Sequence, residues 1–503
     1  MMVLRKSSKT ATGMIRLSSG NQMKYMEPAM NSPSSSIPTF QHSDIPSILI
    51  KNADVVNEGI TRSADVLIRH GRIDRIDCAI SAEADLIIDA EGKALLPGMI
   101  DCHVHFREPG LTHKGDMQSE SRAAAAGGVT SVMEMPNTSP PAVTNERLEE
   151  KFALAAQKMA VNYSFYLGAS LNNLDEIKAV DPKNICGVKV YMGSSTGDML
   201  VDRFQTLEEL FRECPVNLTA HCEDAGIIQR HEQIFRERYG DQTPFAAHPF
   251  IRSEEACYRS SALAVELARR HGTRLHVLHI STARELELFD DLTVRVSSPR
   301  ENEFYEERDE AGKNITAETC IHYLHFDSNA YETKGALVKC NPAIKRASDR
   351  DALLRGLLTD RLDTIGTDHA PHTLKEKQGT YWTAPSGMPV IQSALPAILE
   401  HFHRGALSLE TIAAKTAHNP ARIFNIKERG FIREGYWADL VLVDLNKPQT
   451  VAKENILYKC GWSPFEGVTF RSSVDTTIVS GQIVWKNGKA ESAVRGQRLE
   501  FDR

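Results

Sequence analysis

The middle of the chain repeats one pattern, a short apolar segment followed by a longer amphipathic segment, and this repeat limits the fold more than any other feature. Eight apolar segments have the length and composition of buried β-strands. They lie at 98–106, 129–137, 162–169, 187–193, 216–224, 275–281, 314–320 and 363–372. Residues 145–160 and 253–272 are typical of the helices between them. Eight strand–helix units predict an α/β fold, a (β/α)₈ barrel of the TIM type.

Polar side chains occur at or near the carboxyl ends of six of these segments. They are His105, Asn137, Lys189, His221, His279 and Asp368. In a (β/α)₈ barrel the carboxyl ends of the strands meet on one face, where the chemistry takes place. A doubly wound open sheet is the alternative fold, but it would not explain polar residues at the ends of so many strands.

The two ends of the sequence differ from its middle. Short alternating strands with Gly and Asn turns begin at Ile48 and return near the carboxyl end. We expect residues 45–97 and 430–492 to pair into one small sheet domain beside a barrel domain at 98–429. Residues 1–44, rich in Ser and Met, are expected to be a disordered extension. The charge-dense segment 297–314 is expected to be an exposed loop.

The composition argues against several classes of function. The 503 residues carry a formal net charge of −7 and no basic stripe, so a nucleic-acid binder is not expected. No apolar run approaches the roughly 18 residues that span a bilayer, so no membrane segment is expected. The nine cysteines show no CxxC spacing. In a long chain this indicates reduced thiols and a cytoplasmic location.

The segment 101–110, DCHVHFREPG, places His103, His105 and Arg107 two residues apart at the end of a predicted strand. Residues i and i+2 of a strand point to the same face, so the three side chains are expected to lie side by side. Two imidazoles can bind a metal, and a guanidinium can bind an anion. A pair of histidines in a polar loop is an equal alternative on this segment alone.

Lys189 lies between Val188 and Val190 in a predicted strand, so we expect it to face the barrel interior. An unpaired ammonium there would be costly, and two explanations are open. A salt bridge to a nearby acid is the commoner one. A carbamate formed with CO₂ would instead be an anion that can bridge two cations. Together with His103, His105, His221, His279 and Asp368, this carbamate would complete a ligand set for two divalent ions. Zinc suits such ligands best.

Seven motifs, in this order along the chain, carry a family resemblance: HVHFREPG, MPNTSP, GVKVYMG, AHCED, HVLHIST, CNPAIK and GTDHAPH. Together with NPARIF at 419–424 and GYWADLVLVDL at 435–445, they resemble the dihydroorotases, a cyclic amidase branch of the amidohydrolase superfamily. The resemblance runs from about Ile48 to about Lys489. It implies a metal-bearing (β/α)₈ barrel with a small β-sandwich built from both chain ends.

The resemblance also implies metal ligands. His103, His105 and Asp368 would bind the more buried of two zinc ions, and His221 and His279 would bind the second. A carboxylated Lys189 would bridge the two ions.

Substrate contacts are implied in the same way. Arg107 would bind the ring carboxylate of dihydroorotate through two parallel hydrogen bonds. Asn137 is similar to the second residue that binds this carboxylate, and His372 is similar to a further carboxylate or ring contact. Asn341 is similar to a residue that contacts the ring. Residues 385–389 would supply backbone groups to the ring amide. The chain departs from the family at Lys345, where Arg is frequent, and in the loop PSGMPVIQ.

The resemblance implies reversible cyclisation of N-carbamoyl-L-aspartate to L-dihydroorotate, a step of de novo pyrimidine (UMP) biosynthesis. A hydroxide bridging the two metals would attack the ring carbonyl, with Asp368 as general acid and base. Allantoinase, hydantoinase and dihydropyrimidinase are the alternative activities. A catalytically silent homologue, serving as an assembly subunit, is the alternative from another class. We expect a homo-oligomer, with association with aspartate carbamoyltransferase as a further hypothesis.

Overall fold

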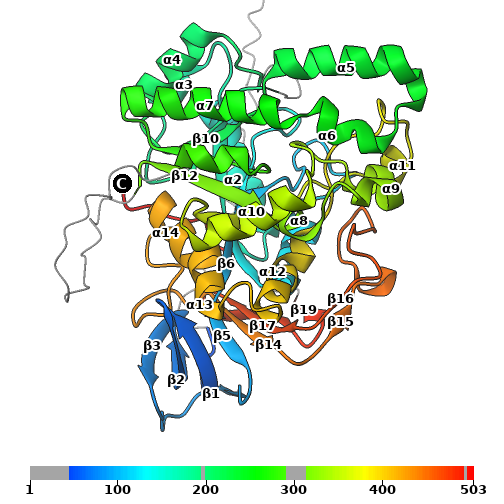
Figure 1. The fold of residues 1–503 in the computed structure, drawn as a ribbon. Coiled ribbons are helices and arrows are strands. Elements are labelled where there is room, and N and C mark those ends of the chain that lie inside the picture. Colours follow the sequence, from blue (N-terminus) through cyan, green and yellow to red (C-terminus); the bar gives the residue numbers. More distant parts are fainter. Residues whose placement is uncertain (1–44, 194–198, 290–312, 492–495) are drawn as a thin grey trace, which may run out of the picture. The chain divides into compact units, whose positions relative to one another are not determined.

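The computed structural model describes residues 45–193, 199–289, 313–491 and 496–503 of the chain (Figure 1). The predictions for residues 1–44 and for nearly all of segment 297–314 therefore lie outside the described residues. No helix in the described ranges combines the length and the apolar character that crossing a membrane requires.

Eight parallel strands form one sheet and follow each other in chain order. They are β6 (Met99–Val104), β7 (Val129–Glu134), β8 (Asn162–Gly168), β9 (Gly187–Tyr191), β10 (Leu218–His221), β11 (Leu275–Val277), β12 (Ile315–Cys320) and β13 (Thr364–Gly366). A parallel bridge between Val104 and His369 joins the first strand to the segment after the last one. The sheet thus closes on itself, and the predicted (β/α)₈ barrel is confirmed.

Helices follow the strands and pack around them (Figure 1). The longer ones are α1 (Met117–Ala126), α2 (Asn145–Lys158), α4 (Phe204–Glu213), α5 (Ala225–Tyr239), α7 (Glu254–His271), α10 (Ala347–Leu358) and α12 (Ala394–His403). The shorter ones are α3 (Leu174–Lys178), α6 (His248–Ile251), α8 (Ile321–His325), α9 (Ala330–Lys334), α11 (Leu374–Lys377), α13 (Leu409–Ala413) and α14 (Asn419–Phe424). Helices α2 and α7 match the two predicted ones, and the side chains of Thr144 and Ser253 cap their first turns.

The two ends of the chain build a second, mixed sheet, in the order β19-β18-β17-β14-β5-β1-β2-β3 with β4 on β1. Its strands are β1 (Ile48–Asn57), β2 (Ile60–Arg69), β3 (Arg72–Asp77), β4 (Leu86–Asp89), β5 (Ala94–Pro97), β14 (Leu440–Asp444), β17 (Ser473–Val479), β18 (Gln482–Lys486) and β19 (Lys489–Ala490). Strand β5 pairs antiparallel with β14 and so joins the two ends (Figure 1).

The second sheet has an apolar core of its own. Ile50, Val66, Leu440 and Ile478 belong to one buried cluster, distinct from the barrel core. Side chains from both chain ends therefore enclose a common interior, and the predicted small β-sandwich is confirmed. The boundaries 45–97, 98–429 and 430–492 stay a prediction.

Two structural features near the carboxyl end were not predicted. Between β14 and β17 the chain forms a separate two-stranded hairpin, β15 (Gln449–Thr450) and β16 (Thr469–Phe470). Residues 496–503 return to the barrel. There the Tyr163 backbone N–H donates to the Gln497 carbonyl (3.0 Å), and the Leu499 N–H donates to the Tyr163 carbonyl (2.9 Å).

We expect Arg429→Met to lower the free energy of unfolding by about 3–5 kcal/mol, because it would leave a buried carboxylate unpaired. Arg429 is 3% exposed and forms an ion pair with Asp439. Asp439 also accepts hydrogen bonds from Asn162 Nδ2 of β8 (3.0 Å) and from the Ser480 backbone N–H (2.7 Å). The cluster thus ties the barrel to the second sheet.

Denaturant-induced unfolding measures this effect. Arg433→Met is the matched control, since it removes the more exposed ion pair with Glu58, and such pairs contribute about 0–1 kcal/mol. Equal losses in the two variants would contradict a special role for the buried cluster.

Candidate active site

The carboxyl ends of five barrel strands bring the six predicted metal ligands to one end of the barrel. His103, Lys189 and His221 lie in β6, β9 and β10, whereas His105, His279 and Asp368 follow β6, β11 and β13 by one or two residues. All six side chains are buried. His279 and Asp368 have left-handed backbone conformations, with φ of 42° and 46°. Such angles are uncommon outside glycine, and they turn both side chains as the strands end.

Three of these residues converge on one point. The Nε2 atoms of His103 and His105 lie 3.2 Å and 3.1 Å from Oδ1 of Asp368. One ligand atom from each of the three residues lies within 4.8 Å of the others. Two imidazole nitrogens and a carboxylate oxygen at such distances form a donor set that zinc accepts.

Acceptor groups hold the opposite nitrogens of the same two rings. His103 Nδ1 lies 2.9 Å from Oε1 of Glu318, and His105 Nδ1 lies 2.7 Å from Oδ1 of Asn137. A neutral imidazole carries one N–H, and an ionised Glu318 and the Asn137 amide oxygen place it on Nδ1 of each ring. Two Nε2 lone pairs then face the Asp368 carboxylate, an arrangement of acceptors that a cation would stabilise. The residues present therefore fit a divalent metal.

A second pair of histidines shows the same arrangement. His221 Nδ1 lies 2.8 Å from His279 Nε2, and His221 Nε2 lies 3.0 Å from Oε2 of Glu223. The carboxylate of Glu223 also forms an ion pair with Arg252. With the His221 proton directed to Glu223, its Nδ1 lone pair faces the His279 ring. This pair can supply two ligands to a second metal ion.

Lys189 lies inside the barrel with 1% of its surface exposed. Among the residues that the structure describes, no carboxylate forms an ion pair with it, so the salt-bridge explanation finds no partner there. Its Nζ lies 4.7 Å from the centre of the Tyr191 ring. Burial lowers the pKa of the Lys189 ammonium to about 7.

The electrostatics of the ligands suit metal binding. Burial lowers the pKa of His103 and of His105 to about 4, so both rings are neutral near pH 7. Metals bind this neutral form. Burial alone would raise the pKa of Asp368, but its contacts with the two histidines hold it well below its usual range. The carboxylate therefore stays ionised.

Two carboxylates beside the histidines were not among the predicted site residues. Glu318 of β12 is fully buried, with its Oε2 lacking a hydrogen-bond partner among the described residues, and burial raises its pKa to about 8. Glu223 is also fully buried. The available signals were the two-residue spacings, Glu318 before Cys320 in one predicted strand and Glu223 after His221. Glu318, Cys320 and His103 also offer three ligand atoms within 4.8 Å of one another.

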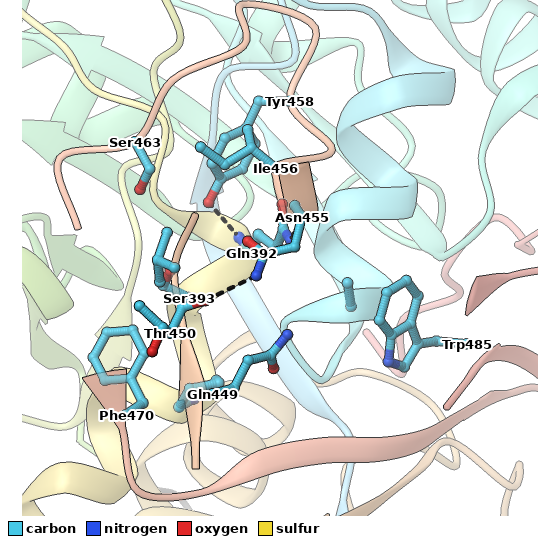
Figure 2. Close-up of a pocket in the computed structure, with 13 residues that line it drawn as sticks. Gln392, Ser393, Gln449, Thr450, Asn455, Ile456, Tyr458, Ser463, Phe470 and Trp485 are labelled. Atoms are coloured by element: carbon cyan, nitrogen blue, oxygen red, sulfur yellow. Dashed lines mark hydrogen bonds between the residues drawn. The ribbon is translucent and has the colours of Figure 1, made fainter. Parts of the chain in front are cut away.

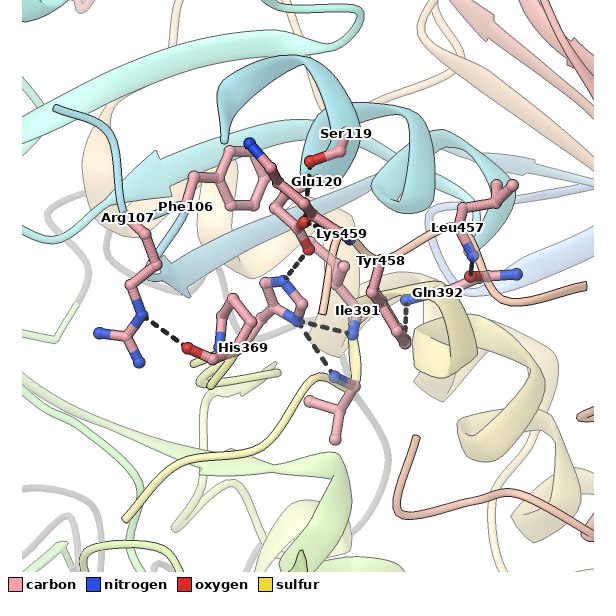
Figure 3. Close-up of polar contacts among 12 residues, drawn as sticks. Phe106, Arg107, Ser119, Glu120, His369, Ile391, Gln392, Leu457, Tyr458 and Lys459 are labelled. Carbon is pink, nitrogen blue, oxygen red and sulfur yellow. Dashed lines mark hydrogen bonds and ion pairs between the residues drawn. The ribbon is translucent and has the colours of Figure 1, made fainter. Parts of the chain in front are cut away.

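A polar network supports the loop that carries Asp368 (Figure 3). His369 Nε2 lies 2.8 Å from Oε2 of Glu120 in α1, and its Nδ1 accepts from the Val390 backbone N–H at 3.1 Å. Glu120 Oε1 in turn accepts from the Lys459 backbone N–H at 3.0 Å. The network joins α1, the loop after β13 and the segment between β15 and β16, so the residue next to Asp368 is held from two sides.

The predicted carboxylate-binding residues also meet. Arg107, at φ 71° beyond the end of β6, donates from Nε to the Pro371 carbonyl at 3.0 Å. Its Nη2 lies 3.2 Å from His372 Nε2. On the other side of this ring, Lys114 Nζ lies 3.2 Å from His372 Nδ1. Arg107 and His372 are both buried, and Lys114 was not among the predicted residues.

The two predicted asparagines are placed differently. Asn137 contacts His105 through Oδ1, so it orients a candidate ligand, and its Nδ2 is the group left for a substrate. Oδ1 of Asn341 is buried and has no hydrogen-bond partner among the described residues. A buried amide oxygen of this kind is costly unless a further donor reaches it. Lys345, the departure from the family pattern, donates to the Ala343 carbonyl at 2.9 Å.

A separate small pocket lies where the hairpin of β15 and β16 meets the barrel (Figure 2). Gln392, Thr450, Asn455 and Tyr458 are among its lining residues, and none of the ten predicted site residues is. The space of about 30 Å³ inside it is enough for a few water molecules.

Comparisons with known proteins identify the family of the chain. The chain is 34% identical to the dihydroorotase of Halobacterium salinarum, over 87% of this chain and 97% of that protein. It is 32% identical to the allantoinase of Desulfitobacterium hafniense, over 90% and 98%. The L-hydantoinase structure from Arthrobacter aurescens superimposes with a TM-score of 0.81 at 27% identity, covering 88% and 97%. The Amidohydrolase family model matches residues 94–484, and the chain therefore belongs to the amidohydrolase family.

Proposed function

We propose that the chain is a zinc-dependent dihydroorotase, which interconverts N-carbamoyl-L-aspartate and L-dihydroorotate in pyrimidine biosynthesis. The observation that carries the proposal is the buried Arg107 close to the candidate metal ligands. A guanidinium pairs with a carboxylate, and dihydroorotate has a ring carboxylate that hydantoin, allantoin and dihydrouracil lack. The dihydroorotase names of several relatives at 29–34% identity support the same choice.

In this proposal two zinc ions occupy the barrel mouth. His103, His105 and Asp368 would hold one, His221 and His279 would hold the other, and a carboxylated Lys189 would be a ligand to both. Bound zinc would activate water near neutral pH and polarise the amide carbonyl. Glu318 and Glu223 orient the histidines through their second ring nitrogens, a contact that raises ligand basicity.

Asp368 moves the proton. In hydrolysis its carboxylate takes the proton of the attacking water and passes it to the leaving amide nitrogen. In ring closure the same carboxylate removes the proton of the ureido nitrogen. Arg107, Asn137 and His372 hold the carboxylate of the substrate, and the unpaired Oδ1 of Asn341 accepts a ring N–H.

A second candidate is hydrolysis of an uncharged cyclic amide. It is favoured by the similarity to an allantoinase and to solved hydantoinase structures. Assays of one enzyme preparation on dihydroorotate, allantoin, hydantoin and dihydrouracil separate the two candidates.

We expect Arg107→Met to keep its metal and to lose dihydroorotate turnover. Loss of a charge-assisted, two-bond contact should reduce kcat/KM by roughly 30- to 1000-fold. Arg107→Lys should recover only part of this, because an ammonium lacks the planar fork. Steady-state kinetics with metal analysis of each variant measures the effect.

The control is Arg212→Met on the exposed face of α4, which should leave kinetics unchanged. Unaltered dihydroorotate kinetics in Arg107→Met, with metal still bound, would reject the carboxylate assignment. The uncharged cyclic amide would then be the better candidate.

The proposal extends to assembly. We expect a homo-oligomer in the cytoplasm, and association with aspartate carbamoyltransferase would place two consecutive reactions together. Light scattering of the pure protein, alone and mixed with that enzyme, measures both. A monomer that does not shift in mass would reject this extension.

A further inference from the structure

We propose that Lys114 is a positioning residue, which fixes the proton of His372 on Nε2 so that His372 and Arg107 bind the substrate carboxylate as a pair. The inference deepens the proposed function and rests on it. It concerns a residue that lies outside the predicted site and outside the metal ligands.

The His372 ring lies between two cations. Lys114 Nζ is 3.2 Å from Nδ1, and Arg107 Nη2 is 3.2 Å from Nε2. Lysine and arginine only donate hydrogen bonds, and a neutral imidazole has one accepting nitrogen. Burial, followed by the charges of Arg107 and Lys114, lowers the pKa of His372 far below its usual value. The ring is therefore neutral and can accept from only one of its two neighbours.

Lys114 is held in place beside Nδ1 of His372. Its Nζ forms an ion pair with Oε1 of Glu376 at 3.2 Å. Glu376 is itself held by the Thr373 backbone N–H and hydroxyl at 2.8 Å and 2.9 Å. The His372 carbonyl accepts from Trp462 Nε1 at 2.7 Å. Both partners of the Lys114–Nδ1 contact are thus anchored independently.

The surroundings of Nε2 agree with a proton on that atom. A Cβ on Gly387 would lie 3.1 Å from His372 Cδ2, the carbon bonded to Nε2. The backbone of the 385–389 loop therefore passes on the Nε2 side. Against the lowering effects of burial and the nearby cations, the Ser386 backbone acts to raise the pKa of His372, as a carbonyl facing a ring N–H does.

With this tautomer, two donors stand side by side at the substrate end. The Nε2–H of His372 and Nη2 of Arg107 are 3.2 Å apart, and neither can accept from the other. One carboxylate oxygen can accept from both at once, which makes the pair selective for a ring with a carboxylate. An uncharged ring would leave the two donors facing each other. Lys114 thus favours dihydroorotate through His372, without contact with the substrate.

A double-mutant cycle of Lys114→Met and His372→Ala tests the inference. We expect Lys114→Met to raise KM for dihydroorotate by roughly 10- to 100-fold, the range for a hydrogen bond to a charged group. Metal content and kcat should change little. In the His372→Ala background, Lys114→Met should cause no further loss. Lys114→Arg, which keeps a donor, should restore KM, and Lys178→Met on the exposed α3 pair is the control.

Any other result of these assays contradicts either the role of Lys114 or the proposed function. Multiplicative KM effects in the cycle would mean that Lys114 acts on the substrate directly, and an unchanged KM would mean that it does not act. If Lys114→Met does not fold, Lys114→Leu replaces it in the cycle, because Leu also removes both the charge and the N–H donors. Wild-type protein that hydrolyses an uncharged ring and not dihydroorotate would reject the proposed function together with this inference. Wild-type dihydroorotate turnover with a multiplicative cycle would reject the Lys114 role alone.

Discussion

Lys189→Ala is expected to lose one of two bound metals and to lower kcat by at least roughly 10⁴-fold, because metal activation of water is worth several orders of magnitude at neutral pH. Lys189 is 1% exposed and lies in β9, between β8 and β10, the strand of His221. It has no carboxylate partner among the described residues. A carbamate on its Nζ would supply the missing anion. Metal stoichiometry and kcat, measured on the same preparation, check both parts.

Short carboxylates added to Lys189→Ala should return part of the activity, since they offer the two oxygens that the carbamate provided. Lys178→Ala, on the protein surface, should behave as wild type. Intact-mass or density data that show a free amine at Lys189 beside two fully occupied metals would reject the carbamate.

Asp368→Asn is expected to lower kcat by about 10³- to 10⁴-fold even with excess zinc, near the upper end for loss of a general acid–base. The amide cannot take the proton, although it keeps the shape of the carboxylate. Metal affinity should also fall, since His103 and His105 would lose the anion that lies 3.2 Å and 3.1 Å from their Nε2 atoms. Kinetics over a range of zinc concentrations separates the two effects.

Asp363→Asn is the matched control for this variant. Asp363 is a buried carboxylate at the opposite end of β13, where it accepts from Lys313 Nζ at 3.0 Å and from the Ala317 backbone N–H at 2.9 Å. That end of a barrel serves stability, so this variant should unfold more easily and keep its kcat. Comparable kcat losses in both would argue against Asp368 as the proton carrier.

The barrel was predictable because its signals are local. Each apolar segment with a polar residue at its carboxyl end is visible within about ten residues, and topology then places those ends together. The apolar cores of both sheets follow from the same alternation. The tail at 496–503 gave no such signal, because its partners, such as Tyr163 and Glu149, lie more than 300 residues away in sequence.

The parts of the site that escaped prediction depend on contacts across the chain. His103 and Glu318 are 215 residues apart in sequence and 2.9 Å apart in the structure. No spacing rule connects them. Arg107 shows a second limit, because its left-handed backbone ends the strand alternation that predicted its direction. Its guanidinium reaches Pro371 and His372, contacts that only the closed barrel creates.

The pairing of β5 with β14 has a consequence for synthesis of the chain. Strand β5 ends at Pro97 and β14 begins at Leu440. At ~5–20 residues per second, the intervening stretch of about 340 residues takes roughly 17–70 s to translate. For that time the edge of β5 that later pairs with β14 has no partner strand. Leu95 and Leu96 of this strand are buried in the finished fold. Nascent chains that stop before Leu440 would expose this edge, and unpaired edges promote aggregation. A strand translated late, β14, thus covers the edge of β5, one of the first strands translated.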